Sequence, residues 1–306
     1  MTSMLQNVLV SGGIILDHLY KVSCLPQPYF EANILEHSSH FGGRGANVAV
    51  MCASLGIQTG LLAPVGVDFA SSGYKDFLMH SNIDLRGVFE VPTMNMPEVL
   101  IFTDPDNKQI TFVSGVDEIY KDFQVPTSLL EEYSIVHVSS SGNPEFNISL
   151  AASSQKSGCT VFFDVGNDPH VTDPGYLEDM VLHVDFLFLS DREFQKIKSS
   201  IQVETPEDLL DAGIPSVLIL NKDDRSSTLY TSDTTFKTPS FVKECIDPTG
   251  ASDAYCAGFL AGLARGYTPF DCAGFGSIMS SYAVEHTGGQ SALISWEELL
   301  NRYQKL

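Results

Sequence analysis

The segment Asp247-Pro248-Thr249-Gly250-Ala251-Ser252-Asp253-Ala254 leads into the apolar stretch 255–263 and combines carboxylates with a flexible turn. Glycine and small residues at the start of a helix let backbone N–H groups converge, and such a nest binds negative charge without any lysine. A carboxylate beside an anion nest suits a general base that removes a proton from an attacking hydroxyl. The alternative is that Ser252 or Asp253 simply caps the helix.

A second glycine-rich turn, Phe41-Gly42-Gly43-Arg44-Gly45-Ala46-Asn47, precedes the helical pattern 46–55. Glycines allow a sharp turn and a close approach of the backbone to a ligand, and the following helix aims free N–H groups at that ligand. A tight turn without a ligand is the alternative. The turn is a poor dinucleotide fingerprint, because Val48 stands where the third glycine belongs and no acidic residue follows about 20 residues later. The pattern therefore argues against an NAD-dependent oxidoreductase.

Short apolar runs alternate with helical patterns along most of the chain, and these elements must position both motifs. The strand-like runs, bounded by turn residues, are 8–10, 14–16, 61–65, 135–138, 161–163, 186–189 and 217–220. The helical patterns are 46–55, 70–81, 146–155, 192–198, 206–212, 251–264, 271–285 and 296–303. The alternation predicts an α/β fold with a doubly wound, mostly parallel sheet flanked by helices.

Two segments, 20–41 and 88–115, break this rhythm, because they are rich in Pro, Asn, Thr and β-forming residues and lack helical periodicity. The second contains extended runs on both sides of the turn cluster Asp104-Pro105-Asp106-Asn107, which predicts a β-hairpin. We therefore predict two parts of the molecule. Residues 1–15, 45–87 and 116–306 form the α/β core, and residues 16–44 and 88–115 form a small β-sheet lid.

The 306-residue chain carries 17 Lys and Arg against 38 Asp and Glu, a formal charge of −21. This shortage of cations argues against nucleic acid or anionic membranes as partners, since both are bound by clustered Lys and Arg. No apolar run is long enough for a transmembrane helix, and Asp17 interrupts the N-terminal apolar stretch, which argues against a signal peptide. The six cysteines contain no C-x-x-C pair, so we expect reduced thiols in a cytoplasmic protein.

The two motifs together resemble the signature regions of the ribokinase family of carbohydrate and nucleoside kinases, and the resemblance spans nearly the whole chain. It includes the segment from Gly12-Gly13 to Asp17, the Gly-Gly-x-Gly-Ala-Asn turn, the Asp-x-Thr-Gly-Ala-x-Asp loop and the lid-like insertions. No Walker A sequence is present, in agreement with a family that holds ATP without a P-loop. The resemblance implies a ribokinase-like fold and an ATP-dependent phosphotransferase with an alcohol acceptor.

The resemblance also implies roles at matching positions. The catalytic groups that it implies are a base, Asp253, and an anion hole formed by Gly250, Ala251 and Ser252. The groups that bind the hydroxyls of the sugar ring are Asp17, Gly42, Gly43 and Asn47. The groups that bind Mg-ATP are Glu193, Asn221, Ser226 and Gly250. A site for a monovalent cation, K⁺ in many members, matches Asp247 and Thr249 with the loop 285–291. Arg44 could reach a phosphate or lie on the surface.

Three departures from the family pattern bear on the phosphoryl donor. Ser190 replaces the Asn of Asn-x-x-Glu, and Ser252 replaces the second Gly of Gly-Ala-Gly-Asp. The usual Thr-Leu-Gly-x-x-Gly loop is replaced by Asn221-Lys222-Asp223-Asp224-Arg225-Ser226, which lacks both glycines and puts two carboxylates where the nucleotide approaches. Lys222 and Arg225 could compensate for these carboxylates. Otherwise, the chain would be a nucleoside- or sugar-binding regulatory protein with a degenerate ATP loop.

The acceptor is predicted from the hairpin and the C-terminal loop. The hairpin residues 103–112 and the Glu285-His286-x-Gly288-x-Gln290 pattern resemble bacterial and archaeal adenosine or nucleoside kinases of the family. Three aromatic residues could stack on a base or serve ordinary packing: Phe41, Phe102 and Phe112. Ser139 to Ser141 end a strand-like run, where α/β sheets bind ligands.

We therefore predict transfer of the γ-phosphoryl group of ATP to a primary hydroxyl of a ribose-containing molecule. A nucleoside such as adenosine is favoured over a free sugar of the ribokinase or fructokinase type. The sequence leaves open whether the protein is a monomer or a homodimer.

Overall fold

The computed structural model describes residues 5–106, 108–115, 119–121, 123–140, 143–166, 169–198, 200–201, 203–286, 288–290 and 293–305. Four residues of the predicted hairpin, strand end and cation loop lie outside these ranges: Asn107, Ser141, Thr287 and Ser291.

The larger of two β-sheets has the strand order β13-β12-β11-β10-β9-β8-β1-β4-β5. Its strands are β1 (Val8–Ser11), β4 (Thr59–Gly66), β5 (Ile83–Val91), β8 (Ile135–Ser139), β9 (Thr160–Asp164), β10 (Phe186–Ser190), β11 (Ser216–Leu220), β12 (Ser227–Thr231) and β13 (Thr235–Thr238). All neighbours from β11 to β5 pair in parallel, whereas β12 and β13 extend one edge in antiparallel pairing.

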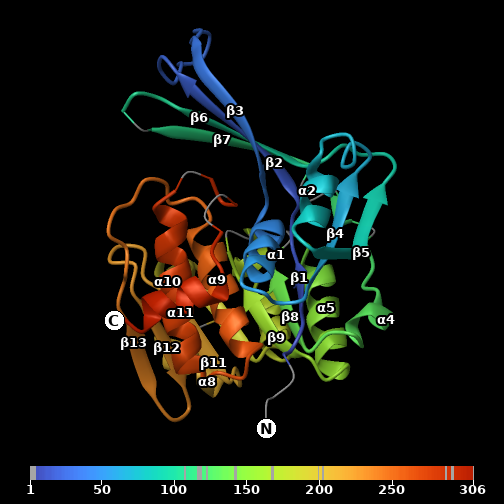
Figure 1. Cartoon of the computed structure of the whole chain (residues 1–306), viewed down its shortest axis with the longest axis vertical. Helices are drawn as coiled ribbons and strands as arrows, with labels where there is room; N and C mark the ends of the chain where they lie inside the picture. Colours follow the sequence, from blue (N-terminus) through green and yellow to red (C-terminus); the bar gives the residue numbers. More distant parts are fainter. Residues whose placement is uncertain are drawn as a thin grey trace.

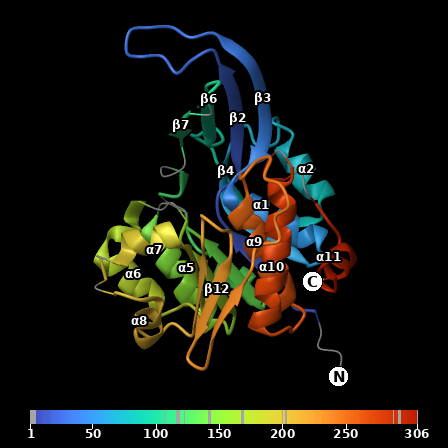
Figure 2. The same ribbon diagram turned by 90° about the vertical axis from the view of Figure 1, so that its left-hand side faces the viewer.

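Helices cover both faces of this sheet, as the view in Figure 2 shows edge-on. One face carries α1 (Arg44–Ser54), α9 (Ala251–Leu263), α10 (Pro269–Val284) and α11 (Trp296–Tyr303). The other face carries α4 (Thr127–Leu130), α5 (Pro144–Lys156), α6 (Pro174–Val181), α7 (Asp191–Lys198) and α8 (Pro206–Asp211). The short helices α2 (Tyr74–His80) and η1 (Pro169–Thr172) complete the core.

Burial on both faces explains why the central strands appear in the sequence as continuous apolar runs. Phe162 and Phe163 are consecutive in β9, yet they belong to different hydrophobic clusters, because neighbouring residues in a strand point to opposite faces. The predicted α/β class with a doubly wound, mostly parallel sheet is confirmed. No helix within the described part of the chain is long and apolar enough to cross a membrane.

The smaller sheet projects away from the core (Figure 1) and has the strand order β3-β2-β6-β7. Its strands are β2 (Ile15–Val22), β3 (Ile34–Gly42), β6 (Glu98–Thr103) and β7 (Gln109–Ser114). β2 pairs antiparallel with β3 and parallel with β6, and β6 and β7 form the predicted hairpin. The predicted small second sheet is therefore present.

Some predicted elements need correction. The run 14–16 is not a strand beside 8–10, because Ile14 is buried in the core and β2 starts at Ile15 in the smaller sheet. The predicted helix 70–81 is shortened to Tyr74–His80, since Gly73 adopts a left-handed conformation with φ 82°. Strands β12 and β13 and helix α6 were not predicted. The two strands are short and polar, and partial exposure at the sheet edge removes the apolar signal of a buried strand.

Candidate active site

A cavity of about 390 Å³, here called the central cavity, brings together the two glycine-containing motifs. The predicted site residues that line it are Asp17, Gly43, Asn47, Glu193, Thr249, Gly250, Ala251, Ser252 and Asp253. Arg44, Lys222 and Gly166 also line it. Among the described residues, the predicted site members Gly42, Asn221, Ser226 and Asp247 are not part of its wall. Gly42 is nevertheless adjacent, because a Cβ placed there would lie 2.0 Å from Oδ2 of Asp17.

Asp253 is held in the first turn of α9 by groups from α1. Its Oδ2 accepts a hydrogen bond of 2.7 Å from Nδ2 of Asn47, which is 206 residues away in sequence. Its Oδ1 lies 3.5 Å from Nε of Arg44. Helix α9 starts after Gly250, which has a φ of 76° and approaches Gly289 too closely for a side chain. The carboxylate is thus buried, oriented through both oxygens and placed beside a helix N-terminus, where the helix dipole favours negative charge.

The orientation of the Asn47 amide is fixed by a hydrogen-bond network with Gln290 and Tyr74, which was not predicted from the sequence. Nε2 of Gln290 donates to Oδ1 of Asn47 at 2.8 Å and also to Oη of Tyr74 at 2.7 Å. The Tyr74 hydroxyl in turn donates to the carbonyl of Gly42 at 2.7 Å. Because the Asn47 carbonyl accepts from Gln290, its NH₂ group must face Asp253. The network therefore links the glycine-rich turn, α2 and the C-terminal loop to the carboxylate.

Arg44 lines the central cavity, and a buried carboxylate, that of Asp164, holds its guanidinium in place. Its Nη2 donates to Oδ2 of Asp164 at 2.6 Å, and its guanidinium packs so closely on Gly166 that a Cβ there would overlap it. Burial opposes the charge on Arg44, but Asp164 and Asp253 outweigh this effect and raise the pKa of Arg44. Its side chain remains 32% exposed toward the cavity, so the expectation of a plain surface residue does not hold.

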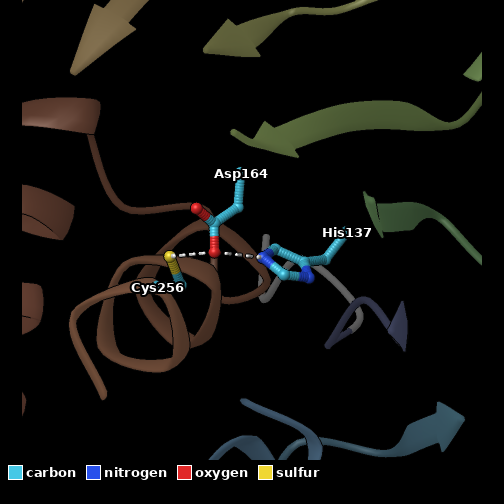
Figure 3. A group of neighbouring side chains, drawn as sticks. All are labelled: His137, Asp164 and Cys256. Atoms are coloured by element: carbon cyan, nitrogen blue, oxygen red, sulfur yellow. Dashed lines mark hydrogen bonds and ion pairs between the residues drawn. The ribbon is translucent and has the colours of Figure 1, made fainter. Parts of the chain in front are cut away.

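Behind Asp164 lies a fully buried cluster with His137 and Cys256, drawn in Figure 3. Burial, assisted by the charge of Arg44, lowers the pKa of His137 to about 3, so the imidazole is neutral at physiological pH. Burial next to Asp164 and Asp253 raises the pKa of the Cys256 thiol well above its ordinary value. The contact of 3.9 Å between His137 Nε2 and Asp164 Oδ2 is therefore not an ion pair between two charged groups.

The ligand atoms of these three side chains lie within 4.8 Å of one another, close enough to be considered for a metal ion. However, the shared Asp164 Oδ2 already accepts the short hydrogen bond from Arg44, and a dication there would lie next to the guanidinium. Cys256 would also have to ionise in a buried position, which its raised pKa opposes. We therefore assign the cluster to holding Arg44 in place.

Asp17 of β2 also lines the central cavity, and its surroundings disfavour the charged form of its carboxyl group. Burial, together with the nearby Asp253, raises its pKa to about 6. Maintaining an ionised Asp17 therefore costs folding free energy at neutral pH. Such a cost is common where a carboxylate is kept to bind a ligand.

Glu193 caps the helix that carries it. Its Oε2 accepts from the backbone N–H of Ser190 at 2.6 Å, and Oγ of Ser190 accepts from the N–H of Glu193 at 3.2 Å. This reciprocal pair is a capping box. It gives Ser190 a structural role and keeps Glu193 at the cavity wall.

The loop 221–226, predicted to contact the nucleotide through Asn221 and Ser226, uses both of these side chains for contacts of its own. Ser226 is buried and its Oγ donates to Asp224, whereas Asn221 binds the N–H of Asp223, so both side chains are engaged within the loop. Asp223 lies 3.6 Å from Arg192, and Asp224 lies 3.2 Å from Lys237. The two carboxylates thus have cationic partners, and neither is among the described residues that line the central cavity.

Asp247 connects two loops. Its Oδ1 accepts from the N–H of Thr249 and its Oδ2 accepts from the N–H of Gly288, both at 2.9 Å. Burial opposes its ionisation, but these hydrogen bonds outweigh burial and lower the pKa of Asp247. The carboxylate is therefore ionised and contacts the loop 285–291, predicted for the cation, at Gly288.

The pairing register of the smaller sheet shows which of its side chains lie on the same face as Asp17, the face toward the central cavity. Asp17 of β2 pairs with Val99, and Val99 pairs with Val113, so side chains at these positions share one face. Phe102 pairs with Tyr20 and Ile110, which places it on the opposite face, where its ring stacks on Tyr20 at 4.7 Å.

Each of the three aromatic residues for which base stacking and ordinary packing were both open packs against a neighbouring ring. Phe112 meets Phe102 edge-on at 6.0 Å, and Phe41 stacks on Tyr74 at 4.3 Å.

A second cavity of about 570 Å³, here called the lid cavity, lies between the smaller sheet and the core and shares Thr249 with the central cavity. Its apolar wall includes Leu19, Ile101 and Ile246, and its polar wall includes Thr103, Asp104 and Gln109.

The family of the chain follows from comparison with known proteins. The profile of the pfkB family carbohydrate kinases matches residues 10–296. This chain belongs to the pfkB family.

Its relatives include the nucleoside kinase of Methanocaldococcus jannaschii, which is 33% identical over 98% of both chains. The nucleoside kinase of Methanothermobacter thermautotrophicus is 31% identical over 97% of this chain and 96% of its own. The crystal structure of the M. jannaschii nucleoside kinase, a ribokinase-family member, superposes with a TM-score of 0.92 over 98% of this chain and 99% of that one.

This pfkB member is therefore a kinase of the ribokinase type that acts on a sugar or a nucleoside, and its fold is ribokinase-like. It is a phosphotransferase with an alcohol group as acceptor. Kinases of this family use ATP, which implies a divalent cation. The carboxylate of Glu193 at the cavity wall fits that need, since Mg²⁺ prefers oxygen ligands.

Two residues of the candidate site were not found from the sequence: Tyr74 and Asp164. Tyr74 carries no sequence signal, because nothing local distinguishes it from an ordinary core tyrosine. Asp164 does carry one, since it directly follows the apolar run 161–163 at the carboxyl end of a parallel strand, where ligands of α/β sheets bind.

Proposed function

We propose that this kinase transfers the γ-phosphoryl group of ATP to the primary hydroxyl of a nucleoside. The observation that carries the proposal is the lid cavity, which shares the wall residue Thr249 with the central cavity. A free pentose would need the central cavity alone. The lid cavity offers apolar walls for the faces of a base and polar groups, such as Gln109, for its edges. The 33% identity to a nucleoside kinase supports the same acceptor class.

In this proposal, the ribose lies in the central cavity. Asp17, with Gly42 leaving room beside it and Gly43 in the same cavity wall, accepts hydrogen bonds from the ring hydroxyls. Asn47 contributes at the same wall, while its amide holds Asp253 in place. The smaller sheet, formed by β2, β3, β6 and β7, acts as the lid over the acceptor and excludes water, so that transfer is favoured over hydrolysis of ATP.

Asp253 then removes the proton from the primary hydroxyl as its oxygen attacks the γ-phosphorus, and the bond from phosphorus to the ADP oxygen breaks. The N-terminus of α9, with Gly250, Ala251 and Ser252, stabilises the negative charge on the phosphoryl oxygens. Magnesium, when bound with ATP, would neutralise phosphate charge near Glu193. Among the other predicted nucleotide contacts, Asn221 and Ser226 shape the loop.

The test of the acceptor is a phosphorylation screen of purine and pyrimidine nucleosides against free ribose and fructose, with Mg-ATP and with or without K⁺. We expect turnover of nucleosides to exceed that of free sugars. Stimulation by K⁺ would support a monovalent cation at Asp247 and Thr249. Turnover of free sugars alone would overturn the nucleoside assignment, and binding of nucleosides without any turnover would favour the regulatory protein.

A substitution in the lid cavity tests the position of the base. Ile101→Trp fills this cavity from β6, so we expect kcat/KM for nucleosides to fall more than about tenfold. Leu100→Trp is the matched control, because Leu100 pairs with His18 and lies on the opposite face of the sheet. Equal losses in the two variants would contradict a base site under the lid.

The raised pKa of Asp17 predicts an acidic limb in the pH profile. The ionised carboxylate accepts hydroxyl hydrogen bonds through both oxygens, whereas protonation removes the charge and turns one oxygen into a donor. We therefore expect kcat/KM for the acceptor to fall about tenfold per pH unit below the pKa of about 6. Asp17→Asn should lower kcat/KM at pH 8 and remove this limb. A limb that persists in Asp17→Asn would assign it to another group.

The same variant should be more stable. The folded pKa of Asp17 lies above its unfolded value, so the folded state binds the proton more tightly and stability is lost as pH rises from about 4 to about 6. At pH 7, Asp17→Asn should therefore raise the free energy of unfolding in urea by about 1–3 kcal/mol.

A further inference from the structure

Two departures of this chain from the family pattern touch one another. Lys222 lies in the loop that lacks the usual glycines, and Ser252 stands where the family carries glycine at the anion nest. Nζ of Lys222 donates a hydrogen bond of 3.1 Å to Oγ of Ser252, and both residues line the central cavity. The backbone N–H of Lys222 is anchored by Oδ1 of Asp191 at 3.2 Å, which fixes the base of its side chain.

Of the two cations in the cavity wall, Lys222 is the one whose charge can still pair with a ligand. Arg44, the other cation in the wall, is already engaged by Asp164 at 2.6 Å and by Asp253 at 3.5 Å. No carboxylate of the described residues lies within ion-pair distance of Lys222. An ammonium group has three donors, so Lys222 can keep its bond to Ser252 and still offer N–H groups to a second acceptor.

The rest of the loop is turned away from the cavity. Asp223 and Asp224 face Arg192 and Lys237. Arg225 adopts a left-handed conformation with a φ of 56°, and its Nη2 reaches Sγ of Cys245 at 2.8 Å. Within the described residues 221–226, Lys222 is thus the one that lines the cavity.

We propose that Lys222, held by Ser252, binds the terminal phosphates of the donor nucleotide from a loop that lacks the glycines of the family pattern. This inference rests on the proposed function. Ser252 then has two roles: its backbone belongs to the anion nest, and its hydroxyl holds the ammonium over that nest. A lysine in this position adds positive charge where the γ-phosphoryl group must lie, next to Asp253.

The test is Lys222→Met, which keeps an unbranched side chain one atom shorter and removes its charge. Calorimetric titrations with Mg-ATP and with AMP separate a contact to the terminal phosphates from a general loss of binding. We expect the Kd for Mg-ATP to rise about 10- to 100-fold and the Kd for AMP to change less than about twofold. Lys237→Met is the matched control, because Lys237 neighbours the same loop but contacts Asp224 outside the cavity.

The possible outcomes are distinct. If the wild-type protein binds Mg-ATP and Lys222→Met binds it within about twofold, the assignment of Lys222 is overturned and the proposed function stands. Equal losses for Mg-ATP and AMP also overturn it. If the wild-type protein binds no Mg-ATP at millimolar concentration, the proposed function fails and this inference fails with it.

Ser252→Gly tests the pairing. We expect it to weaken Mg-ATP binding about fivefold alone and less than about twofold in the Lys222→Met background, since the hydroxyl acts through the lysine. Effects that multiply in the double variant would overturn the pairing.

Discussion

Replacement of Asp253 by asparagine is expected to lower kcat for nucleoside phosphorylation by about 100- to 10,000-fold. The amide has the same shape as the carboxylate, but it cannot take the proton of the attacking hydroxyl. Asparagine can still accept the hydrogen bond from Nδ2 of Asn47, so the wall of the cavity is preserved. We therefore expect KM for the acceptor to change only a few-fold.

The measurement is the initial rate at saturating nucleoside and Mg-ATP, with thermal unfolding as the check on the fold. Asp223→Asn is the matched control, because it removes the same charge from an 86% exposed position outside the cavity. A kcat for Asp253→Asn within tenfold of the wild-type value would remove Asp253 from the role of base.

The same substitution should change the acidic limb assigned to Asp17. The charge of Asp253 contributes to the raised pKa of Asp17, second only to burial. Removing that charge should move the limb to lower pH in whatever activity remains. The two carboxylates are therefore coupled electrostatically, and in the proposed function one of them binds the acceptor and the other activates it.

The overall charge of −21 is compatible with a phosphate-bearing substrate because the relevant charges are local. The central cavity is lined by the carboxylates of Asp17, Glu193 and Asp253 against the cations Arg44 and Lys222. Backbone N–H groups at the start of α9 and a divalent cation can supply the remaining positive potential. None of these contributions appears in a count of lysine and arginine.

The features that sequence predicted well are those with a local cause. The central strands are buried on both faces and therefore leave continuous apolar runs, and Gly250 and Asp253 lie within one turn of each other. Asp17 and Asn47 were identified through the resemblance of their segments to a family, and the structure brings both to one cavity.

Two kinds of feature were not predicted: contacts between residues far apart in sequence, and the face of the sheet on which a side chain lies. The bonds of Gln290 to Asn47 and Tyr74 join residues 243 and 216 positions apart, and no local pattern says which side chains will meet. Phe102 and Phe112 were considered as base-stacking residues. Their face is decided by the register with β2, and a shift of one residue would reverse it.

The glycine-rich turn has a structural role that the sequence could not separate from ligand binding. Three glycines were expected to let the backbone approach a ligand. In the structure, a Cβ on Gly45 would lie 2.5 Å from the carbonyl carbon and oxygen of Gly12 and 2.6 Å from its Cα. Gly45 therefore allows the start of α1 to pack on the end of β1, and the approach is of backbone to backbone.

Gly45→Ala is accordingly expected to lower the free energy of unfolding by about 3 kcal/mol or more, at the upper end of what overpacking costs. Relief requires α1 to move, because the obstructing atoms are backbone and not a flexible side chain. The measurement is the urea unfolding midpoint at pH 7. Gly175→Ala is the matched control, since a Cβ at Gly175 in α6 meets no atom within 4 Å; we expect it to be neutral or stabilising by up to about 1 kcal/mol.

The same clash should reduce activity beyond the loss of folded protein. Helix α1 carries Arg44 and Asn47, which contact Oδ1 and Oδ2 of Asp253, so any shift of its first turn changes the orientation of the base. We expect kcat per folded molecule to fall at least about tenfold, because displacements near 1 Å cost catalysis on that scale or more. A Gly45→Ala protein with wild-type stability and kcat would show that the contact with Gly12 is not needed to hold the site.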